Sequence, residues 1–241
     1  MRNAGELFDD YADSYEHALG AALTVSGESR EYFAEERIKW LKRCLVDLQE
    51  TPKSLLDFGC GDGSSTPLLQ QHLRADTALG VDVSAKSLEL ALKKFANERI
   101  KYTLTDSFVA AGQIDLAYCN GVFHHIPPQH RAAALAVVHS SLQPGGLFSF
   151  WENNPWSLAT RYVMSRCAFD RDAIMLSPAE ARTLLRDNGF AVIRTDFRFI
   201  FPHALRVFRK LEDFVFRLPL GGQYQILCRK MPAHPTTQFT R

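Results

Sequence analysis

A short apolar run that leads straight into three glycines constrains this chain more than any other feature. The run is Ser54–Phe58, and the glycines follow at positions 59, 61 and 63 before a helical pattern begins at Thr66. Glycine lets the backbone turn sharply and approach a ligand closely, because no Cβ stands in the way. A strand, a glycine-rich turn and a helix in this order are typical of an open α/β sheet that binds a ligand at the carboxyl ends of its strands.

The rest of the chain continues the alternation of strand and helix. We predict strands over 54–58, 77–83, 100–105, 114–120 and 147–152, with helices between them over 66–73, 85–97 and 128–142. This spacing predicts a mostly parallel sheet with right-handed crossovers. A helix over 177–188 and two more strands, 190–200 and 223–229, complete the expected fold. Ser84 and Ser177 are placed to cap the helices that begin beside them. That fold is α/β and Rossmann-like: seven mostly parallel strands with helices on both faces, the last strand being antiparallel.

Composition limits the function classes. The 28 Lys and Arg residues exceed the 27 Asp and Glu residues by one, which predicts no nucleic-acid partner. The five cysteines form no CxxC pair, as expected for reduced thiols without a zinc ribbon. The N-terminal stretch is interrupted by charges, unlike a signal peptide, and no apolar run is long enough to span a membrane. We therefore expect a cytoplasmic protein of one domain over 1–241.

Acidic residues mark the expected ligand crevice. Asp57 precedes the first glycine and Asp62 lies inside the loop, while Asp82 and Asp106 end the next two predicted strands. Negative charge is unfavourable beside a pyrophosphate but favourable beside a cation. Asp82 is placed to accept hydrogen bonds from ribose hydroxyls, and Asp106 from an exocyclic amine. The loop also has Ser64 where a dinucleotide fingerprint has its third glycine. An adenosine with a cationic tail fits these acids better than NAD does.

These residues resemble the class I S-adenosylmethionine-dependent methyltransferases, from about Leu55 to Glu152. The segment DFGCGDG is similar to the first motif of that family and GVDVS to its second. The resemblance implies S-adenosylmethionine as cofactor and a cofactor-binding core over 51–152. By position, it places the methionine end of the cofactor beside Asp57, Gly59 and Gly61, with Cys60 as a further cofactor-binding residue. It assigns the ribose hydroxyls to Asp82 and the adenine to Val83, Asp106 and Ser107. Asn120 would line the space near the sulfonium.

The opening FDDYADSYE is similar to a segment of the ubiquinone- and menaquinone-type small-molecule methyltransferases. In that group the segment belongs to an N-terminal lid. The resemblance therefore implies a helical lid over 1–50, in which Tyr11 and Tyr15 help to close the cofactor site. Tyrosines at helical spacing are also common in cores, and that alternative stays open.

His124 and His125 follow the fourth predicted strand and are the candidate catalytic residues. A histidine near neutral pKa at this place is suited to act as a base towards a hydroxyl or amine acceptor. Because neighbouring side chains point to different sides, we expect only one of the two to face the substrate; a purely structural role is the alternative. The spacing of His124, His125 and His130 matches no common ligand motif, so no metal site is predicted.

Two segments, 153–176 and 198–222, are expected to form caps on the acceptor side. Four side chains in or just before the first segment are candidates for an apolar wall, with core packing as the alternative: Trp151, Trp156, Tyr162 and Met164. The second contains a predicted basic amphipathic helix over 202–218. Such a helix is typical of a peripheral membrane contact, here through 203–218, or of a cap over an apolar substrate. A helix packed on the sheet or at a homodimer interface is the alternative.

The function that these features favour is S-adenosylmethionine-dependent O-methylation of a small, apolar or lipid-like acceptor by in-line methyl transfer. Two alternatives remain at this stage. One is a nicotinamide-dependent oxidoreductase, and the other is a non-catalytic regulatory module that binds S-adenosylmethionine.

Overall fold

The computed structural model describes residues 9, 26–167 and 170–232 of the chain. Its centre is a seven-stranded sheet in the order β3-β2-β1-β4-β5-β7-β6. The strands are β1 (Ser54–Phe58), β2 (Thr77–Asp82), β3 (Ile100–Leu104), β4 (Ile114–Asn120), β5 (Leu142–Asn153), β6 (Phe190–Arg198) and β7 (Gln223–Lys230). Strands β1 to β5 pair in parallel, and β7 is antiparallel to both β5 and β6. The predicted fold, with its antiparallel last strand, is confirmed.

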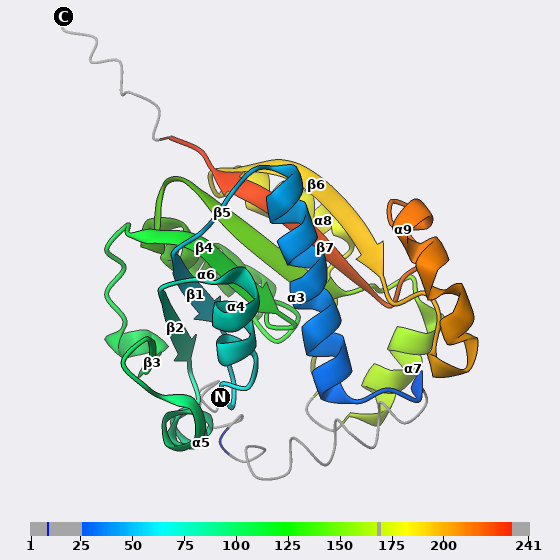
Figure 1. Ribbon diagram of the computed structural model, residues 1–241, viewed down its shortest axis with the longest axis horizontal. Helices are drawn as coiled ribbons and strands as arrows, with labels where there is room; N and C mark the ends of the chain where they lie inside the picture. The colour runs from blue at the N-terminus through cyan, green and yellow to red at the C-terminus, as the bar shows by residue number, and fades with distance from the viewer. Residues whose placement is uncertain (1–8, 10–25, 168–169, 233–241) are drawn as a thin grey trace, which may run out of the picture.

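Helices cover both faces of this sheet (Figure 1). On the face towards the viewer lie α3 (Arg30–Asp47), α4 (Ser65–Leu73) and α5 (Ala85–Phe95); behind it lie α6 (Pro128–Ser141) and α8 (Pro178–Asp187). Each layer has its own apolar cluster. Ile38 and Leu41 of α3 pack on one face, and Leu135 and Val138 of α6 pack on the other. Burial on both faces explains why the central strands read as continuous apolar runs.

The helix starts follow their capping residues. Ser29, Ser84 and Ser177 each accept a hydrogen bond from a backbone N–H two or three residues beyond the cap, and Ser177 forms a full capping box with Glu180. A serine oxygen at this position satisfies an N–H that has no partner inside the helix. The predicted starts of α5 and α8 are therefore confirmed by the same residues that predicted them.

The segment 198–222 differs most from its prediction. Instead of one amphipathic α-helix it forms 3₁₀ turns over His203–Leu211, broken at Leu205, followed by the short α9 (Glu212–Val215). The buried Glu212 carboxylate accepts hydrogen bonds of 3.0 Å from the backbone N–H groups of 199, 200 and 201, which fixes the start of the segment. The prediction of one helix was wrong because apolar periodicity carries no sign of this anchor.

Two basic side chains of this segment contact other parts of the protein and do not form a membrane-facing stripe. Arg209 pairs with Glu28 at 2.7 Å and lies over the Tyr32 ring, while Arg198 lies over the Trp40 ring. Several apolar side chains are exposed instead, namely Leu205, Val207, Phe208, Leu211, Phe214 and Leu218. No helix among the described residues is long and apolar enough to cross a membrane. Contact with a membrane surface or a second copy stays a prediction.

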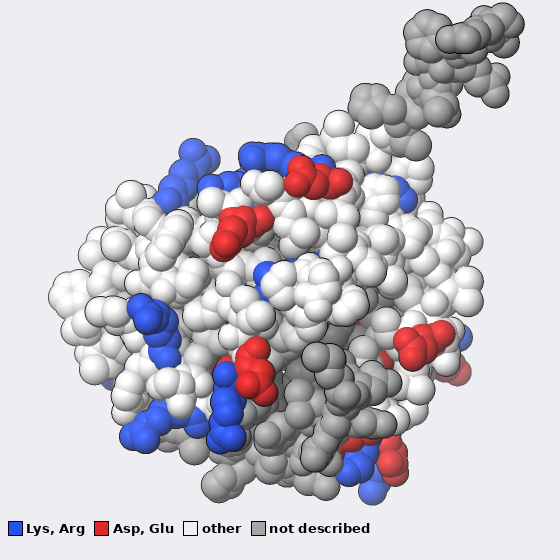
Figure 2. All heavy atoms as spheres, turned by 180° about the vertical axis from the view of Figure 1, so that it is seen from behind, with Lys and Arg blue, Asp and Glu red and all other residues white. Residues whose placement is uncertain are grey.

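The face opposite α3 carries scattered charges (Figure 2). Lys and Arg lie among broad uncharged areas there, several of them beside Asp or Glu, and they form no continuous basic stripe on the part of this face that the structure describes. This view is in keeping with the near-neutral charge balance of the chain.

Candidate active site

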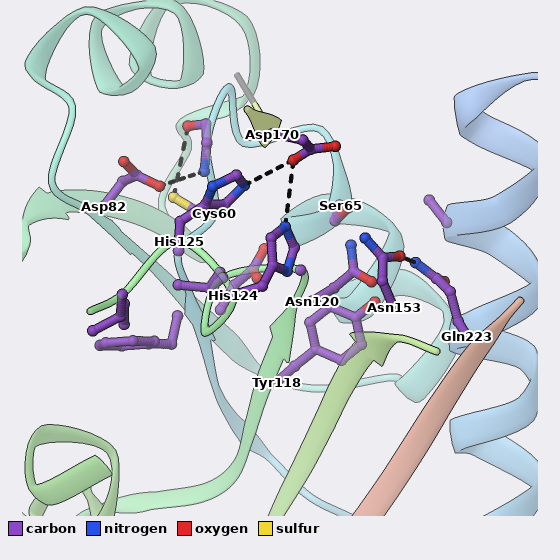
Figure 3. A pocket seen from close by; sticks show the side chains of 18 of the residues that line it. Cys60, Ser65, Asp82, Tyr118, Asn120, His124, His125, Asn153, Asp170 and Gln223 are labelled. Atoms are coloured by element: carbon purple, nitrogen blue, oxygen red, sulfur yellow. Dashed lines mark hydrogen bonds and ion pairs between the residues drawn. The ribbon is translucent and has the colours of Figure 1, made fainter. Parts of the chain in front are cut away.

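A cavity of about 870 Å³ opens at the carboxyl ends of β1, β2 and β4. The glycine loop and Asp82 line one part of it, and α3, α6 and α7 (Leu158–Arg166) close the remainder. Parallel strands bring their carboxyl ends to one edge of the sheet, so residues far apart in sequence meet there. The cavity therefore lies where the sequence predicted a ligand crevice (Figure 3).

The glycine loop is held in shape by backbone contacts across the sheet. Gly59 has a φ of +72°, and a Cβ at this position would overlap the side chain of Val122. The N–H groups of Gly59 and Cys60 donate to the carbonyl of Val81 at 2.8 and 3.1 Å. Only glycine adopts this conformation and this close approach without strain.

Asp82 connects the loop to the end of β2. One of its carboxylate oxygens accepts from the Gly61 N–H at 2.8 Å, and the other accepts from the Ser84 N–H at 2.9 Å. Burial raises the pKa of Asp82, and these backbone donors work in the opposite direction. The next residue, Val83, is exposed at 42% and lines the same cavity.

Asp57 lies deeper, at the floor of the cavity. Its carboxylate accepts from the Thr66 hydroxyl at 2.7 Å, and its side chain is almost fully buried. Burial raises the pKa of Asp57 to about 7, with a further contribution from the negative charges of Asp82 and Asp62. The group is thus poised to ionise when a positive charge approaches.

Asp62 does not offer a free charge to a ligand. Arg30, at the start of α3, donates to both of its carboxylate oxygens at 2.7 and 2.8 Å. Burial opposes ionisation, but Arg30 outweighs it and the pKa of Asp62 is lowered. Asp62 lines the cavity as Asp57 does, but Arg30 already compensates its charge. Contact of either loop acid with a cationic ligand stays a prediction.

The remaining predicted cofactor residues divide into two groups. Cys60 and Asn120 line the cavity, and the buried Oδ1 of Asn120 has no hydrogen-bond partner among the described residues. Asp106 and Ser107 lie in a 3₁₀ turn after β3, exposed, and the residue of that turn on the cavity wall is Thr105. Their contact with adenine stays a prediction, as does that of Tyr11, which lies outside the described residues.

Sequence reasoning missed Arg37. Its side chain is 6% exposed and lines the cavity, and it donates to the Tyr118 hydroxyl at 3.2 Å and to Gln223 at 2.9 Å. Among the described residues no carboxylate pairs with it. A signal was present in the sequence, because Arg37 falls on the apolar face of α3 between Phe33 and Leu41, four residues from each.

His124 and His125 both line the cavity, so the expectation that only one faces it is corrected. Their rings lie 4.1 Å apart, tilted, as the turn after β4 carries them to the same wall (Figure 3). Glu152, at the end of β5, contacts Nδ1 of His124 at 2.6 Å, and Asp170 lies 3.5 Å from its Nε2. Burial disfavours the charged imidazole, but these carboxylates outweigh it and raise the pKa of His124 to about 10. Burial and the neighbouring His124 lower the pKa of His125 to about 4.

The expected apolar wall is only partly formed by the predicted residues. Met164 lines the cavity, whereas Trp151 is fully buried in the core and Trp156 and Tyr162 are exposed away from it. The apolar lining comes instead from one face of α6, where His130, Ala133, Ala134 and Val137 recur at helical spacing, and from Val163 of α7. The described part of the site is thus polar around the glycine loop, while α6 and α7 contribute mainly small and apolar side chains to the lining.

A family model described as a methyltransferase domain matches residues 29–200. The trans-aconitate 2-methyltransferase of Rhodopseudomonas palustris (strain BisB5) is 25% identical over 167 residues, which is 68% of this chain and 64% of that enzyme. The chain thus spans less than two thirds of the length of this relative. An uncharacterized methyltransferase of Synechocystis is 27% identical, covering 75% of this chain and 86% of the relative.

A solved structure supports the same fold. The crystal structure of an S-adenosylmethionine dependent methyltransferase from Mesorhizobium loti has a TM-score of 0.54 and 22% identity, covering 73% of this chain and 90% of that one. At this identity the likeness is one of fold.

Proposed function

The chain belongs to the class I S-adenosylmethionine-dependent methyltransferases, and we propose that it methylates a small acceptor, on oxygen, in the cavity that the glycine loop, α6 and α7 line. The single observation that carries the proposal is the arrangement of polar groups around the glycine loop. An ionisable carboxyl, a buried guanidinium and a buried amide oxygen that has no hydrogen-bond partner in the described part of the chain line the cavity near the glycine loop.

These groups fit the amino-acid end of the cofactor. Asp57 and the Oδ1 of Asn120 are acceptors suited to an ammonium group, and Arg37 is a donor suited to a carboxylate. A buried charge without a counter-ion is costly, so a zwitterionic ligand between Asp57 and Arg37 would offset the burial of both. Asp82 and Val83 would hold the ribose and the adenine.

When bound, S-adenosylmethionine supplies an electrophilic methyl group on a sulfonium. What the chain contributes is alignment and exclusion of water, which are strong levers for a displacement reaction. The apolar face of α6 and Val163 and Met164 of α7 would hold the acceptor's carbon skeleton. The polar end formed by His124, His125 and Asp170 would receive the oxygen to be methylated.

The acceptor class is proposed to be apolar or lipid-like, on the strength of this lining. A second candidate is a small organic acid, since the Rhodopseudomonas relative is named for trans-aconitate and Arg37 offers a guanidinium inside the cavity. Proton removal was predicted from the sequence for His124 or His125. In this proposal it falls to His125, because a pKa of about 10 keeps His124 protonated near neutral pH while His125 is neutral. It is not needed for binding.

Calorimetric titration with S-adenosylhomocysteine and with NAD⁺ tests the cofactor assignment. We expect binding of S-adenosylhomocysteine and none of NAD⁺, with Asp82→Ala weakening the former at least about tenfold, as expected for loss of a charged hydrogen-bond acceptor. The matched control is Asp76→Ala, an acid at the opposite end of β2. Binding of NAD⁺ alone would overturn the proposal in favour of an oxidoreductase.

Turnover separates an enzyme from a regulatory module. The purified chain with S-adenosylmethionine would be offered phenolic, isoprenoid and carboxylic acceptors, trans-aconitate among them, and methylated products would be identified by mass spectrometry. Methyl groups on oxygen of an apolar acceptor would support the proposal. Products only from organic acids would favour the second acceptor class, and binding without any turnover across the panel would favour the regulatory module.

A further inference from the structure

Three side chains of types that commonly bind metal ions meet on one wall of the cavity. His124 and His125 come from the turn after β4, and Asp170 comes from the segment after α7, far along the chain. The Oδ1 of Asp170 lies 3.5 Å from Nε2 of His124 and 3.4 Å from Nε2 of His125 (Figure 3). The donor atoms of the three residues all lie within 4.8 Å of one another.

The distances suit a shared ion better than hydrogen bonds among the three. Oδ1 of Asp170 is buried and, in the described structure, makes no hydrogen bond that meets normal geometry. Two ligands each about 2.1 Å from a tetrahedral zinc ion lie about 3.4 Å apart. The two separations that involve Asp170 are thus those expected of ligands around one ion.

Glu152 orients His124 for this role. Its Oε2 lies 2.6 Å from Nδ1 of His124, and its Oε1 accepts from the N–H groups of Phe123 and His124 at 2.7 and 3.3 Å. A carboxylate on one imidazole nitrogen fixes the ring and leaves the other nitrogen to bind an ion, an arrangement that recurs in zinc proteins. Here that other nitrogen is the Nε2 that faces Asp170.

The charges of the pocket also favour a cation. Glu152 and Asp170 are two carboxylates with side chains 1% and 7% exposed, on either side of the His124 ring, whose single positive charge when protonated offsets only one of them. The guanidinium of Arg131 donates to the backbone carbonyls of 123, 126 and 174. A divalent cation would compensate the carboxylates where they are buried.

We propose that His124, His125 and Asp170 bind a first-row divalent ion, of which Zn²⁺ and Mn²⁺ are the representative cases. Two imidazole nitrogens and one carboxylate oxygen form a donor set that these ions accept and that leaves coordination positions open. The open side faces the cavity, where His124, His125 and Asp170 all contribute to the lining. Building on the proposed function, the ion would bind the acceptor oxygen and hold it for methyl transfer, with His125 acting as a ligand rather than as a base.

The test is direct metal binding to the full chain without cofactor or acceptor. After chelator treatment and dialysis, the protein is titrated with Zn²⁺, Mn²⁺ and Mg²⁺ by calorimetry, and bound metal is counted by mass spectrometry. We expect one equivalent of Zn²⁺ or Mn²⁺, and weaker binding of Mg²⁺, which prefers oxygen ligands. Asp170→Asn should weaken binding at least about 100-fold, and Glu152→Gln, which acts through His124, about 10–100-fold.

His130→Asn is the matched control, because His130 lines the same cavity but lies outside the three-residue cluster. Its metal affinity should equal that of the wild type within about twofold. Co²⁺ loading of the wild type gives a second readout that needs no variant to fold, since bound Co²⁺ in a site of low symmetry absorbs strongly in the visible range. Circular dichroism checks the fold of each variant.

Wild type that binds none of these ions, or an Asp170→Asn variant that folds and binds them as tightly, would overturn the proposal. Titration of the same preparation with S-adenosylhomocysteine keeps this result separate from the proposed function. Cofactor binding without metal binding would reject the metal site alone. Metal binding without cofactor binding would reject the proposed function and leave the metal site standing.

Discussion

Arg30 and Asp62 form a two-pronged ion pair that joins the first turn of α3 to the glycine loop. The guanidinium donates to the two carboxylate oxygens at 2.7 and 2.8 Å, and a third hydrogen bond of 3.1 Å reaches the Ser64 hydroxyl. The two side chains are 21% and 15% exposed, so water screens the pair only partly. This contact fixes the loop to a helix that itself lines the cavity.

The coupling of this pair should be measurable by a double-mutant cycle. We expect Arg30→Gln and Asp62→Asn to interact by about 1–2 kcal/mol in the free energy of unfolding, because two-pronged, partly buried pairs exceed ordinary surface pairs. Urea denaturation of the two single variants and the double variant gives this number. The exposed pair Lys39–Glu36 on the same helix serves as the control, with an expected coupling of about 0.5 kcal/mol or less. Equal couplings for the two pairs would contradict the prediction.

Gly59 and Gly61 provide a matched pair of glycine substitutions. Both have positive φ, +72° and +55°, but an added Cβ would overlap Val122 at Gly59 and meet nothing within 4 Å at Gly61. We expect Gly61→Ala to cost about 1 kcal/mol from backbone strain alone, and Gly59→Ala about 2–4 kcal/mol because overlap adds to it. Thermal denaturation measures both, and Val122→Ala in the Gly59→Ala background should recover part of the loss. No recovery would mean that the overlap is not the cause.

The fold could be predicted from the sequence because its signals are local. The apolar run before Gly59 and the capping serines Ser84 and Ser177 act within a few residues of where they stand, and the structure confirms the elements that they predicted. Parallel strands then bring their carboxyl ends together without further information. The cavity followed from the alternation of strand and helix for the same reason.

The finer features of the site depend on partners that are distant in sequence. Arg30 neutralises Asp62 from 32 residues away, and Glu152 holds His124 from 28 residues away. Spacing along the chain cannot show such contacts, so the sequence overestimated the free charge of the loop and did not reveal Asp170 beside the histidines. Arg37 was the exception: a charged residue on an apolar helix face is a signal that could have been used.

Asp57 should make both stability and cofactor binding depend on pH. Its pKa in the folded protein is about 7, above the value of about 3.9 expected in the unfolded chain. The folded state therefore binds the proton more tightly, and its contribution to stability is greatest below about pH 4 and is lost as the pH rises through about 7. Relative to Asp57→Asn, the unliganded wild type should lose melting temperature over this range. A constant difference between the two proteins from pH 5 to 8 would argue against the raised pKa.

The same group should release a proton when the cofactor binds. A positive charge near Asp57 favours its ionised form, so the affinity for S-adenosylhomocysteine, which retains the ammonium group, should rise with pH up to about 7. Calorimetry in two buffers of different ionisation enthalpy at pH 6 gives the number of protons released, which we expect to approach one for the wild type and to fall for Asp57→Asn. Equal proton release by the two proteins would place the coupled group elsewhere.

A bulky side chain on α6 tests whether the acceptor binds against this helix. Ala133 and Ala132 are neighbouring, exposed residues of this helix, but only Ala133 lines the cavity in the described structure. Ala133→Trp should narrow the cavity along α6 and lower kcat/KM for the acceptor about tenfold or more, since a misplaced acceptor loses the benefit of alignment. Affinity for S-adenosylhomocysteine should stay within about twofold, and Ala132→Trp should change neither quantity, because surface substitutions of this kind are usually near neutral. A parallel loss of cofactor affinity in Ala133→Trp would mean that the acceptor does not bind against α6.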